Sequence, residues 1–250
     1  MASKPWHGSK WPKGVTHEIS GYEKPLYSIL DNAASKYPDA TYTIFADVGH
    51  TFRQVKDTAD RIANFLASHG IGKGDRVAIF LPNLPHFPEI FFGILKAGAT
   101  AVTCNPLYKS SELNYQLKDC GAKALFVMDH PVFYPTAAAA LEGTEAKTVV
   151  ICNVKSYLPK LKGMLGSLLG KIPKAERHEP GHFLFDDIVK ASKPQTPSLN
   201  INPKEDVALI IYSGGTTGTP KGACVSHANV LSNVLCVQEW VRVSEKPGGP

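Results

Sequence analysis

Short runs of apolar residues that alternate with longer helical patterns constrain the fold of this chain most strongly. The runs are rich in Val and Ile, and they lack the inward and outward alternation of a sheet with one solvent face. Such runs suit strands that are buried between two layers of helices. They occupy residues 77–81, 99–104, 122–128, 148–152 and 207–212. The predicted fold class is therefore α/β, with mostly parallel sheets layered with helices.

The clearest helix signal lies before these runs, in residues 51–70. Its apolar residues recur at steps of three and four, Thr51 and Gln54 have the spacing of a capping box, and Gly70 supplies a stop. This pattern predicts a surface helix with one face on the core. Further helical patterns occur at residues 88–98, 111–121 and 132–141.

Length and composition exclude several classes of protein. With 250 residues, of which 43% are hydrophobic, the chain can form one large or two small domains. The net charge of +5 comes from 27 basic and 22 acidic residues. These numbers are too similar for a basic arm that binds nucleic acid, which leaves anionic small molecules or a lipid surface as partners. Five widely spaced cysteines without a C-x-x-C pair argue against a disulfide framework or a zinc ribbon, and they fit a reducing cytosol.

Membrane insertion is not predicted either. No apolar run reaches the roughly 20 residues of a transmembrane helix, and the N-terminus lacks the apolar core of a signal peptide. We expect a cytoplasmic protein, soluble or peripheral on the cytosolic face of a membrane. Residues 155–177 combine leucines near helical spacing with six cations, which is typical of an interfacial amphipathic element. Three glycines in this segment disfavour a helix in water, so a solvated loop is the alternative.

The last strand-like run leads directly into a loop of glycines and hydroxyl side chains. This loop begins at Ser213 and ends at Pro220 and Lys221. Glycine lets the backbone approach a ligand closely, and free N–H groups can converge on an anion. The ammonium group of Lys221 adds a charge that can follow phosphate oxygens. We therefore expect a phosphate-binding loop here.

Two common phosphate motifs do not describe this loop. Walker A has glycine immediately before its lysine, whereas Pro220 precedes Lys221 here. The glycines at 214, 215 and 218 also lack the spacing of the dinucleotide fingerprint G-x-G-x-x-G. A flexible hairpin loop is the remaining alternative, and the order of eleven consecutive residues argues against it.

The segment YSGGTTGTPKG, residues 212–222, resembles the nucleotide-binding signature of the AMP-forming acyl-CoA synthetases, which are adenylate-forming enzymes. The usual family form has Thr where this chain has Ser213 and Ser where it has Gly214, so one hydroxyl contact to the nucleotide is lost. The Gly-Gly version resembles long-chain fatty acid:CoA ligases. Residues 81–127, with Asn-Pro-Leu-Tyr and Ile-Leu-x-Ala-Gly, and residues 11–19 are similar to the same ligases.

The resemblance implies a domain, a reaction and a set of ligands. Residues 1–250 would be part of the large N-terminal AMP-binding domain, with the phosphate-binding loop and the following helix in residues 206–250. A fatty carboxylate would react with ATP to give an acyl-adenylate and pyrophosphate, and coenzyme A would then take up the acyl group. Mg²⁺ would bridge phosphate oxygens, with Ser213 as a metal ligand. The implied nucleotide-binding residues are Ser213, Gly214, Gly215, Thr216, Thr217, Gly218 and Lys221, and no catalytic residue is assigned.

Family members have further functional motifs and a second domain after the point that corresponds to position 250. These are a second acidic motif of the metal site, the Asp that binds the ribose, a hinge, and a small C-terminal domain with the adenylation lysine. We therefore expect this chain to form part of an ATP site without turning over alone. The alternatives are a ligase for aryl or medium-chain carboxylates, a non-catalytic nucleotide-binding fragment, and an unrelated phosphotransferase.

Three weaker signals remain. Residues 178–182, HEPGH, match the zinc-protease pattern H-E-x-x-H, but Pro and Gly inside it disfavour the helix that pattern needs, so loop histidines are predicted. His227 is expected at the start of a helix capped by Ser226, with a structural role or a role in the site. Cys224 is expected to be a core residue.

Overall fold

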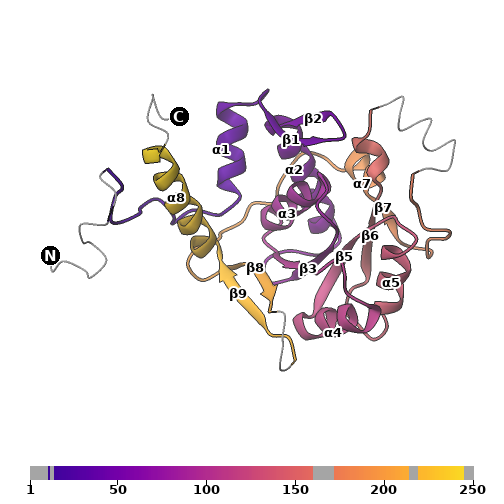
Figure 1. Ribbon diagram of the computed structural model, residues 1–250. Coiled ribbons are helices and arrows are strands. Elements are labelled where there is room, and N and C mark those ends of the chain that lie inside the picture. The colour runs from indigo at the N-terminus through magenta and orange to yellow at the C-terminus, as the bar shows by residue number, and fades with distance from the viewer. Residues whose placement is uncertain (1–10, 12–13, 160–171, 214–218, 245–250) are drawn as a thin grey trace.

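The computed structural model describes residue 11 and residues 14–159, 172–213 and 219–244. Within these residues, seven strands form one sheet in the order β7-β6-β5-β3-β4-β8-β9 (Figure 1). All neighbouring strands are parallel except β8 and β9, which form an antiparallel pair. The strands are β3 Arg76–Phe80, β4 Thr100–Thr103, β5 Ala122–Met128, β6 Thr148–Cys152, β7 Phe183–Leu184, β8 Val207–Tyr212 and β9 Gly222–Ser226.

Helices cover both faces of this sheet (Figure 1). They are α1 Ser28–Lys36, α2 Phe52–Ser68, α3 His86–Lys96, α4 Ser110–Cys120, α5 Phe133–Ala140, α7 Phe185–Ala191 and α8 His227–Ser244, with the 3-10 helix η1 at Val154–Tyr157. Helices α2, α3 and α7 pack on one face, and α4 and α5 pack on the other. The predicted α/β class with a mostly parallel sheet is therefore confirmed.

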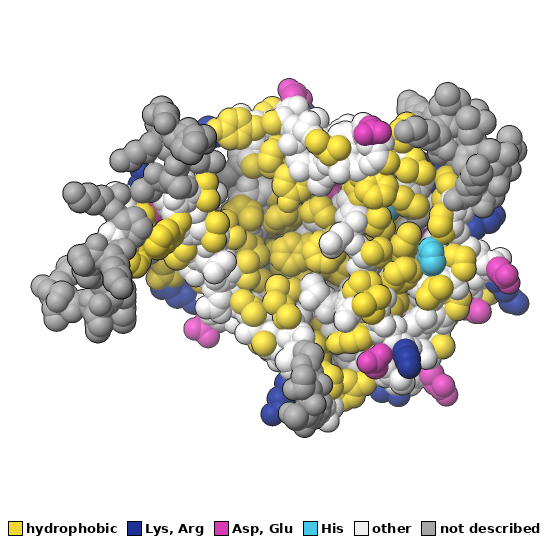
Figure 2. Space-filling model, viewed as in Figure 1, with side chains coloured by type: hydrophobic (Ala, Val, Ile, Leu, Met, Phe, Trp, Pro, Cys, Tyr) yellow, Lys and Arg dark blue, Asp and Glu magenta, His cyan; other side chains and the backbone are white. Residues whose placement is uncertain are grey.

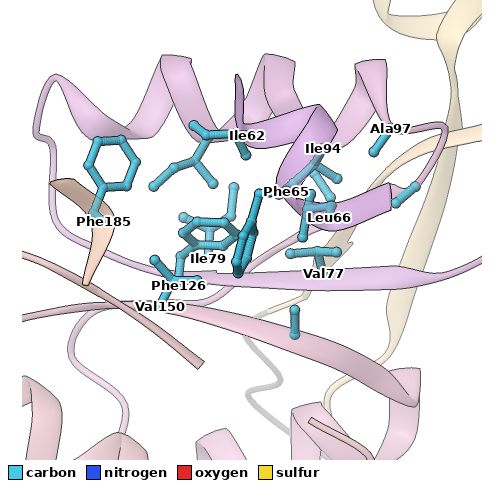
Figure 3. Close-up of a cluster of buried hydrophobic side chains, with 14 of the residues drawn as sticks. Ile62, Phe65, Leu66, Val77, Ile79, Ile94, Ala97, Phe126, Val150 and Phe185 are labelled. Atoms are coloured by element: carbon cyan, nitrogen blue, oxygen red, sulfur yellow. The ribbon is translucent and has the colours of Figure 1, made fainter. Parts of the chain in front are cut away.

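The first face carries the larger core, shown in Figure 3. Ile62 and Leu66 of α2 lie above Val77 and Ile79 of β3, and Phe126 of β5 extends the same layer. All five side chains are almost fully buried. Burying one such side chain stabilises the fold by about 1.5–3 kcal/mol, so this layer fixes α2 and β3 relative to each other.

Helix α2 begins and ends as its sequence predicts. The Thr51 Oγ1 atom accepts a hydrogen bond from the Gln54 backbone N–H at 3.3 Å, and the Gln54 side chain accepts one from the Thr51 N–H at 2.8 Å. This reciprocal pair is the predicted capping box. The helix ends at Ser68, and Gly70 follows with a φ of 70°, a conformation that glycine adopts without a steric penalty.

Burial on both faces holds for the central strands but not for β8. Strands β3, β4, β5 and β6 consist mainly of buried residues. The expectation of full burial is wrong for β8, where Ile211 is 47% exposed. Strand β8 lies beside the edge strand β9, at the end of the sheet where the helix layers provide less cover (Figure 1).

Some of the exposed large apolar side chains lie on β8 and on α8, the helix that follows β9. Ile211 of β8 and Val237 and Trp240 of α8 are all exposed. Figure 2 shows hydrophobic side chains across the middle of the viewed face, with charged side chains mainly around its rim. None of the described helices combines the length and the apolar character that a membrane span needs.

Candidate functional site

The carboxyl ends of β3, β4, β5 and β8 meet at one edge of the sheet, because these strands are parallel. The chain leaves β3 through α3 on one face and leaves β4 through α4 on the opposite face. In open α/β sheets, ligands bind outside the carboxyl ends of the strands near such a reversal. The glycine and threonine loop follows β8, which pairs directly with β4, so it starts beside this reversal.

The two ends of the loop form a narrow neck, defined here as Tyr212, Ser213 and residues 220–222. The Ser213 N–H donates to the Lys221 carbonyl at 3.0 Å, and the Lys221 N–H donates to the Ser213 hydroxyl oxygen at 3.4 Å. These bonds continue the antiparallel ladder of β8 and β9 beyond Tyr212 and Gly222. The structure therefore brings the first and last predicted binding residues, Ser213 and Lys221, side by side.

The other predicted binding residues, Gly214, Gly215, Thr216, Thr217 and Gly218, lie outside the described part of the chain. Ser213 and Lys221 are both exposed. No acidic side chain in the described ranges forms an ion pair with the Lys221 ammonium group, which leaves that charge for a ligand. The neck thus offers a hydroxyl and an ammonium group, a donor set that fits phosphate oxygens. Mg²⁺ favours carboxylates together with phosphates, so this donor set suits Mg²⁺ only when a bound phosphate supplies further oxygens.

Two hydrogen bonds connect the neck to α4. The Tyr115 hydroxyl donates to the Pro220 carbonyl at 3.0 Å, and the Tyr212 hydroxyl donates to the Asp119 carboxylate at 2.5 Å. Burial and the bond to Asp119 raise the pKa of Tyr212, so its hydroxyl stays protonated and remains a donor. A cavity of about 350 Å³ lies beside these contacts, with Tyr115, Tyr212 and Gln116 in its wall.

His227 has a structural position. Its side chain is 1% exposed, and its Nδ1 atom accepts a hydrogen bond from the Leu26 N–H at 3.0 Å. Burial lowers the pKa of His227 to about 4, so the ring is neutral at pH 7 and acts as an acceptor. The predicted cap is confirmed, since the Ser226 hydroxyl accepts from the Asn229 N–H at 3.2 Å. Of the two interpretations of His227, the structure supports the structural one.

The HEPGH histidines lie in an irregular segment with a turn at residues 180–181, as predicted. His178 Nε2 lies 2.9 Å from the Asp129 carboxylate, while His182 Nδ1 lies 2.8 Å from the Tyr134 hydroxyl. The two imidazole rings therefore bond to different residues and do not face a common metal position. Over the ranges that the structure describes, no group of three or more His, Cys, Asp or Glu side chains is arranged to hold a metal.

Two further expectations have different outcomes. Cys224 is exposed on the edge strand β9, so its assignment to the core is wrong. Within residues 155–177, positions 160–171 lie outside the described residues, and membrane contact through this segment stays a prediction. The flanks are held in place, because Tyr157 is buried and the Ala175 N–H donates to Asp129 at 2.8 Å.

The sequence motif alone did not reveal the part of α4 that contacts the neck. Tyr115 and Asp119 lie outside the glycine and threonine motif, about a hundred residues earlier in the chain. Their spacing of four residues was the only available signal, because it places both side chains on one face of a helix.

Comparisons with known proteins agree with the motif. A model of the AMP-binding enzyme family matches residues 30–247. A long-chain-fatty-acid CoA ligase of Bacillus subtilis is 34% identical over 251 residues, which cover 96% of this chain and 43% of the relative. The corresponding ligase of Salmonella typhimurium is 34% identical over 235 residues, covering 90% of this chain and 41% of the relative. The chain thus spans less than half the length of these curated relatives.

Solved structures share the fold. The crystal structure of a long-chain-fatty-acid-CoA ligase from Archaeoglobus fulgidus matches with a TM-score of 0.69 at 25% identity, over 90% of this chain and 41% of that one. The anthranilate CoA ligase AuaEII, in complex with anthranoyl-AMP, matches with a TM-score of 0.67 at 25% identity, over 84% of this chain and 36% of that one.

Proposed function

Because the chain belongs to the AMP-binding enzyme family, we propose that it forms the N-terminal part of an AMP-forming long-chain fatty acid:CoA ligase. In this reaction a fatty carboxylate attacks the α-phosphate of ATP to give an acyl-adenylate and pyrophosphate. The thiol of coenzyme A then displaces AMP. Residues 1–250 would contribute part of the large AMP-binding domain, with residues 206–250 carrying the phosphate-binding loop and the helix after it.

The first step brings an anionic carboxylate to a polyanion, so the site must neutralise charge and hold the phosphates in place. We assign the β- and γ-phosphates to the ammonium group of Lys221 and to the loop between Ser213 and Gly218. Charge-assisted hydrogen bonds of this kind contribute about 1.5–3 kcal/mol each. When bound, Mg²⁺ would supply further positive charge between phosphate oxygens, and Ser213 is the described residue that we place beside it.

One observation carries this proposal. The neck brings the Ser213 hydroxyl against the backbone of Lys221 at the carboxyl end of β8, next to β4, and no described acidic residue pairs with the Lys221 ammonium group. The names of the relatives, at 34% identity, support a fatty acid as the carboxylate.

Titration calorimetry of the 250-residue chain with MgATP tests the nucleotide site. We expect Lys221→Gln to weaken binding by about tenfold or more, because it removes one charge-assisted contact. Lys190→Gln is the matched control, since Lys190 is exposed on α7 and pairs with no described acidic residue. Equal affinities of Lys221→Gln and the unmodified chain would contradict the assignment.

Exchange of labelled pyrophosphate into ATP, measured on a full-length ligase that contains this chain, tests the substrate class. The assay compares long-chain, medium-chain and aryl acids. Exchange that depends on long-chain acids supports the proposal. Exchange with aryl acids alone would favour the aryl-ligase alternative, to which the similarity with the anthranilate CoA ligase points. Binding of ATP without exchange for any acid would indicate a nucleotide-binding role only.

A further inference from the structure

Both strands of the loop neck are attached to the same face of α4. Tyr115 holds the Pro220 carbonyl, directly before Lys221, and Asp119 holds the Tyr212 hydroxyl, directly before Ser213. Tyr115 and Asp119 are four residues apart, so their side chains lie on one face of the helix, one turn from each other. Ser213 and Lys221 are therefore each adjacent in the chain to a residue that bonds to α4.

Gly222 makes one of these contacts sterically feasible. It is the cross-strand partner of Tyr212, and a Cβ atom at position 222 would lie 2.8 Å from Ile210 Cγ2 and 3.1 Å from Tyr212 Cζ. Heavy atoms in proteins do not approach this closely without a shift of one of them. The absence of a side chain at 222 therefore leaves the space in which the Tyr212 ring lies while its hydroxyl bonds to Asp119.

Helix α4 is itself firmly attached to the sheet. Leu113 and Leu117 are fully buried against it, and the Gln116 side-chain amide donates to the Thr103 carbonyl at 3.0 Å. Thr103 is the last residue of β4, the strand that pairs with β8. The neck is thus bonded to α4, and α4 is bonded to β4, the neighbour of β8. These contacts limit how far the neck can move relative to the edge of the sheet.

We propose that α4 is a clamp on the loop neck, with Tyr115 and Asp119 as positioning residues that keep Lys221 and Ser213 oriented toward the phosphates. This inference rests on the proposed nucleotide-binding function. A neck that is already ordered loses less conformational freedom when nucleotide binds, so the clamp raises affinity without contacting the ligand. The competing explanation is that these hydrogen bonds only stabilise the fold.

The substitution Tyr115→Phe removes the hydroxyl and keeps the ring. Trypsin cleavage after Lys221, measured without nucleotide by mass spectrometry of the products, reports how often the neck opens. We expect cleavage to be faster by about twofold to tenfold, and MgATP affinity to fall by a similar factor, with little change in the thermal midpoint. The matched control is Tyr42→Phe, on the distant strand β1 Thr41–Phe45, where the hydroxyl bonds to no described residue.

A second pair of variants separates clamping from stability. Asp119 lies in the last turn of α4, where a negative charge opposes the helix dipole. Asp119→Ala should therefore leave the helix as stable or slightly more stable, and yet speed cleavage after Lys221 and weaken MgATP binding. Asp119→Asn keeps an acceptor for Tyr212 and should restore both values most of the way. Fold stabilisation alone predicts that cleavage becomes faster only when the free energy of unfolding falls.

Each outcome decides between the two explanations. Unchanged cleavage in Tyr115→Phe and Asp119→Ala would overturn the clamp, and faster cleavage with unchanged MgATP affinity would overturn its positioning role. Changes that occur only together with a lower thermal midpoint would overturn it as well. If the unmodified chain binds no MgATP, the proposed function fails, whereas the cleavage comparison still tests the clamp.

Discussion

Helix α3 carries a buried acid and a buried base that make the stability of this chain depend on pH in a calculable way. Glu89 is 1% exposed and accepts a hydrogen bond from the Tyr157 hydroxyl of η1. Burial raises the pKa of Glu89 to about 8; the bond from Tyr157 works against this rise, and the negative charge of Asp186 adds to it. Glu89 is therefore largely protonated at pH 7.

His86 lies three residues earlier and is fully buried. Neither of its ring nitrogens has a hydrogen-bond partner within the described residues. Its ring packs against the rings of Tyr157 and Phe185. Burial, with a smaller contribution from His50, lowers the pKa of His86 to about 3, so this base stays neutral in the folded chain.

The two groups act on stability in opposite directions. Between the ordinary pKa of a glutamate, 4.5, and the value of about 8 for Glu89, the folded state binds more protons than the unfolded state, so stability falls as pH rises. Between 6.5 and about 3, the unfolded state protonates its histidine while His86 stays neutral, so stability falls as pH drops. The two slopes cancel between pH 4.5 and 6.5, and Glu89 acts alone above that range.

We therefore expect this cluster to make the chain less stable by about 1 kcal/mol at pH 8 than at pH 6.5, because the full slope of about 1.36 kcal/mol per unit fades as pH approaches the pKa of Glu89. For a chain of this size, such a loss lowers the thermal midpoint by about 2–4 °C. The substitution Glu89→Gln keeps an acceptor for Tyr157 and removes the titrating group, so its stability should lack this decline.

Urea unfolding followed by circular dichroism at pH 6.5, 7.25 and 8 measures the difference. The matched control is Glu142→Gln, which removes an exposed carboxyl group in the loop after α5 and should keep the decline of the unmodified chain. If Glu89→Gln loses stability between pH 6.5 and 8 in parallel with the unmodified chain, Glu89 does not carry a raised pKa and the reasoning is refuted.

Two further predictions concern the packing of α2 against α3. At Gly93 a Cβ atom would lie 2.6 Å from Ile62 Cγ2 and 3.0 Å from the Ala59 carbonyl oxygen. Gly93→Ala should therefore lower the free energy of unfolding, measured in urea, by about 1–3 kcal/mol. This loss is expected although alanine is the better helix former. Equal or higher stability would show that the two helices can separate at little cost. The buried Lys96 ammonium group bonds to Asp60 at 2.7 Å and also to Asp31, while Lys56 pairs with Asp60 at 2.5 Å. Because Asp60 keeps one cation, Lys96→Met should cost about 1–3 kcal/mol by the same measurement. Adding Asp60→Asn should recover part of that loss, and no recovery would mean that packing of the Lys96 stem causes it.

The parts of the fold that depend on local signals could be predicted from the sequence. The cap of α2 needs only Thr51 and Gln54, which are three residues apart and bond to each other. The central strands have continuous apolar runs because both their faces are covered, and that property shows in each run by itself. Strand order and register depend on contacts between distant segments, and no single run encodes them.

Two missed elements show why the remainder could not be predicted. The hairpin of β1 and β2 Val48–Thr51 turns at Ala46 and Asp47, which have φ values of 48° and 68°. Asn-Gly or Asp-Gly normally marks such a turn, and neither pair is present here. Helix α7 has only seven residues, too few for a helical period to stand out. Both elements exist because neighbouring segments pack against them.

The motif at residues 212–222 contains two groups of residues with different physical roles. Ser213 and Lys221 present a hydroxyl and a charge, and chemical reasoning from the sequence identifies such groups directly. Tyr212 and Gly222, the first and last residues of the motif, present nothing to a phosphate. The structure accounts for them by packing, since Gly222 provides the space for the Tyr212 ring and Asp119 binds its hydroxyl. We therefore expect Gly222→Ala to displace the Tyr212 ring from Asp119 and to lower MgATP affinity in titration calorimetry, although position 222 bears no ligand-binding group.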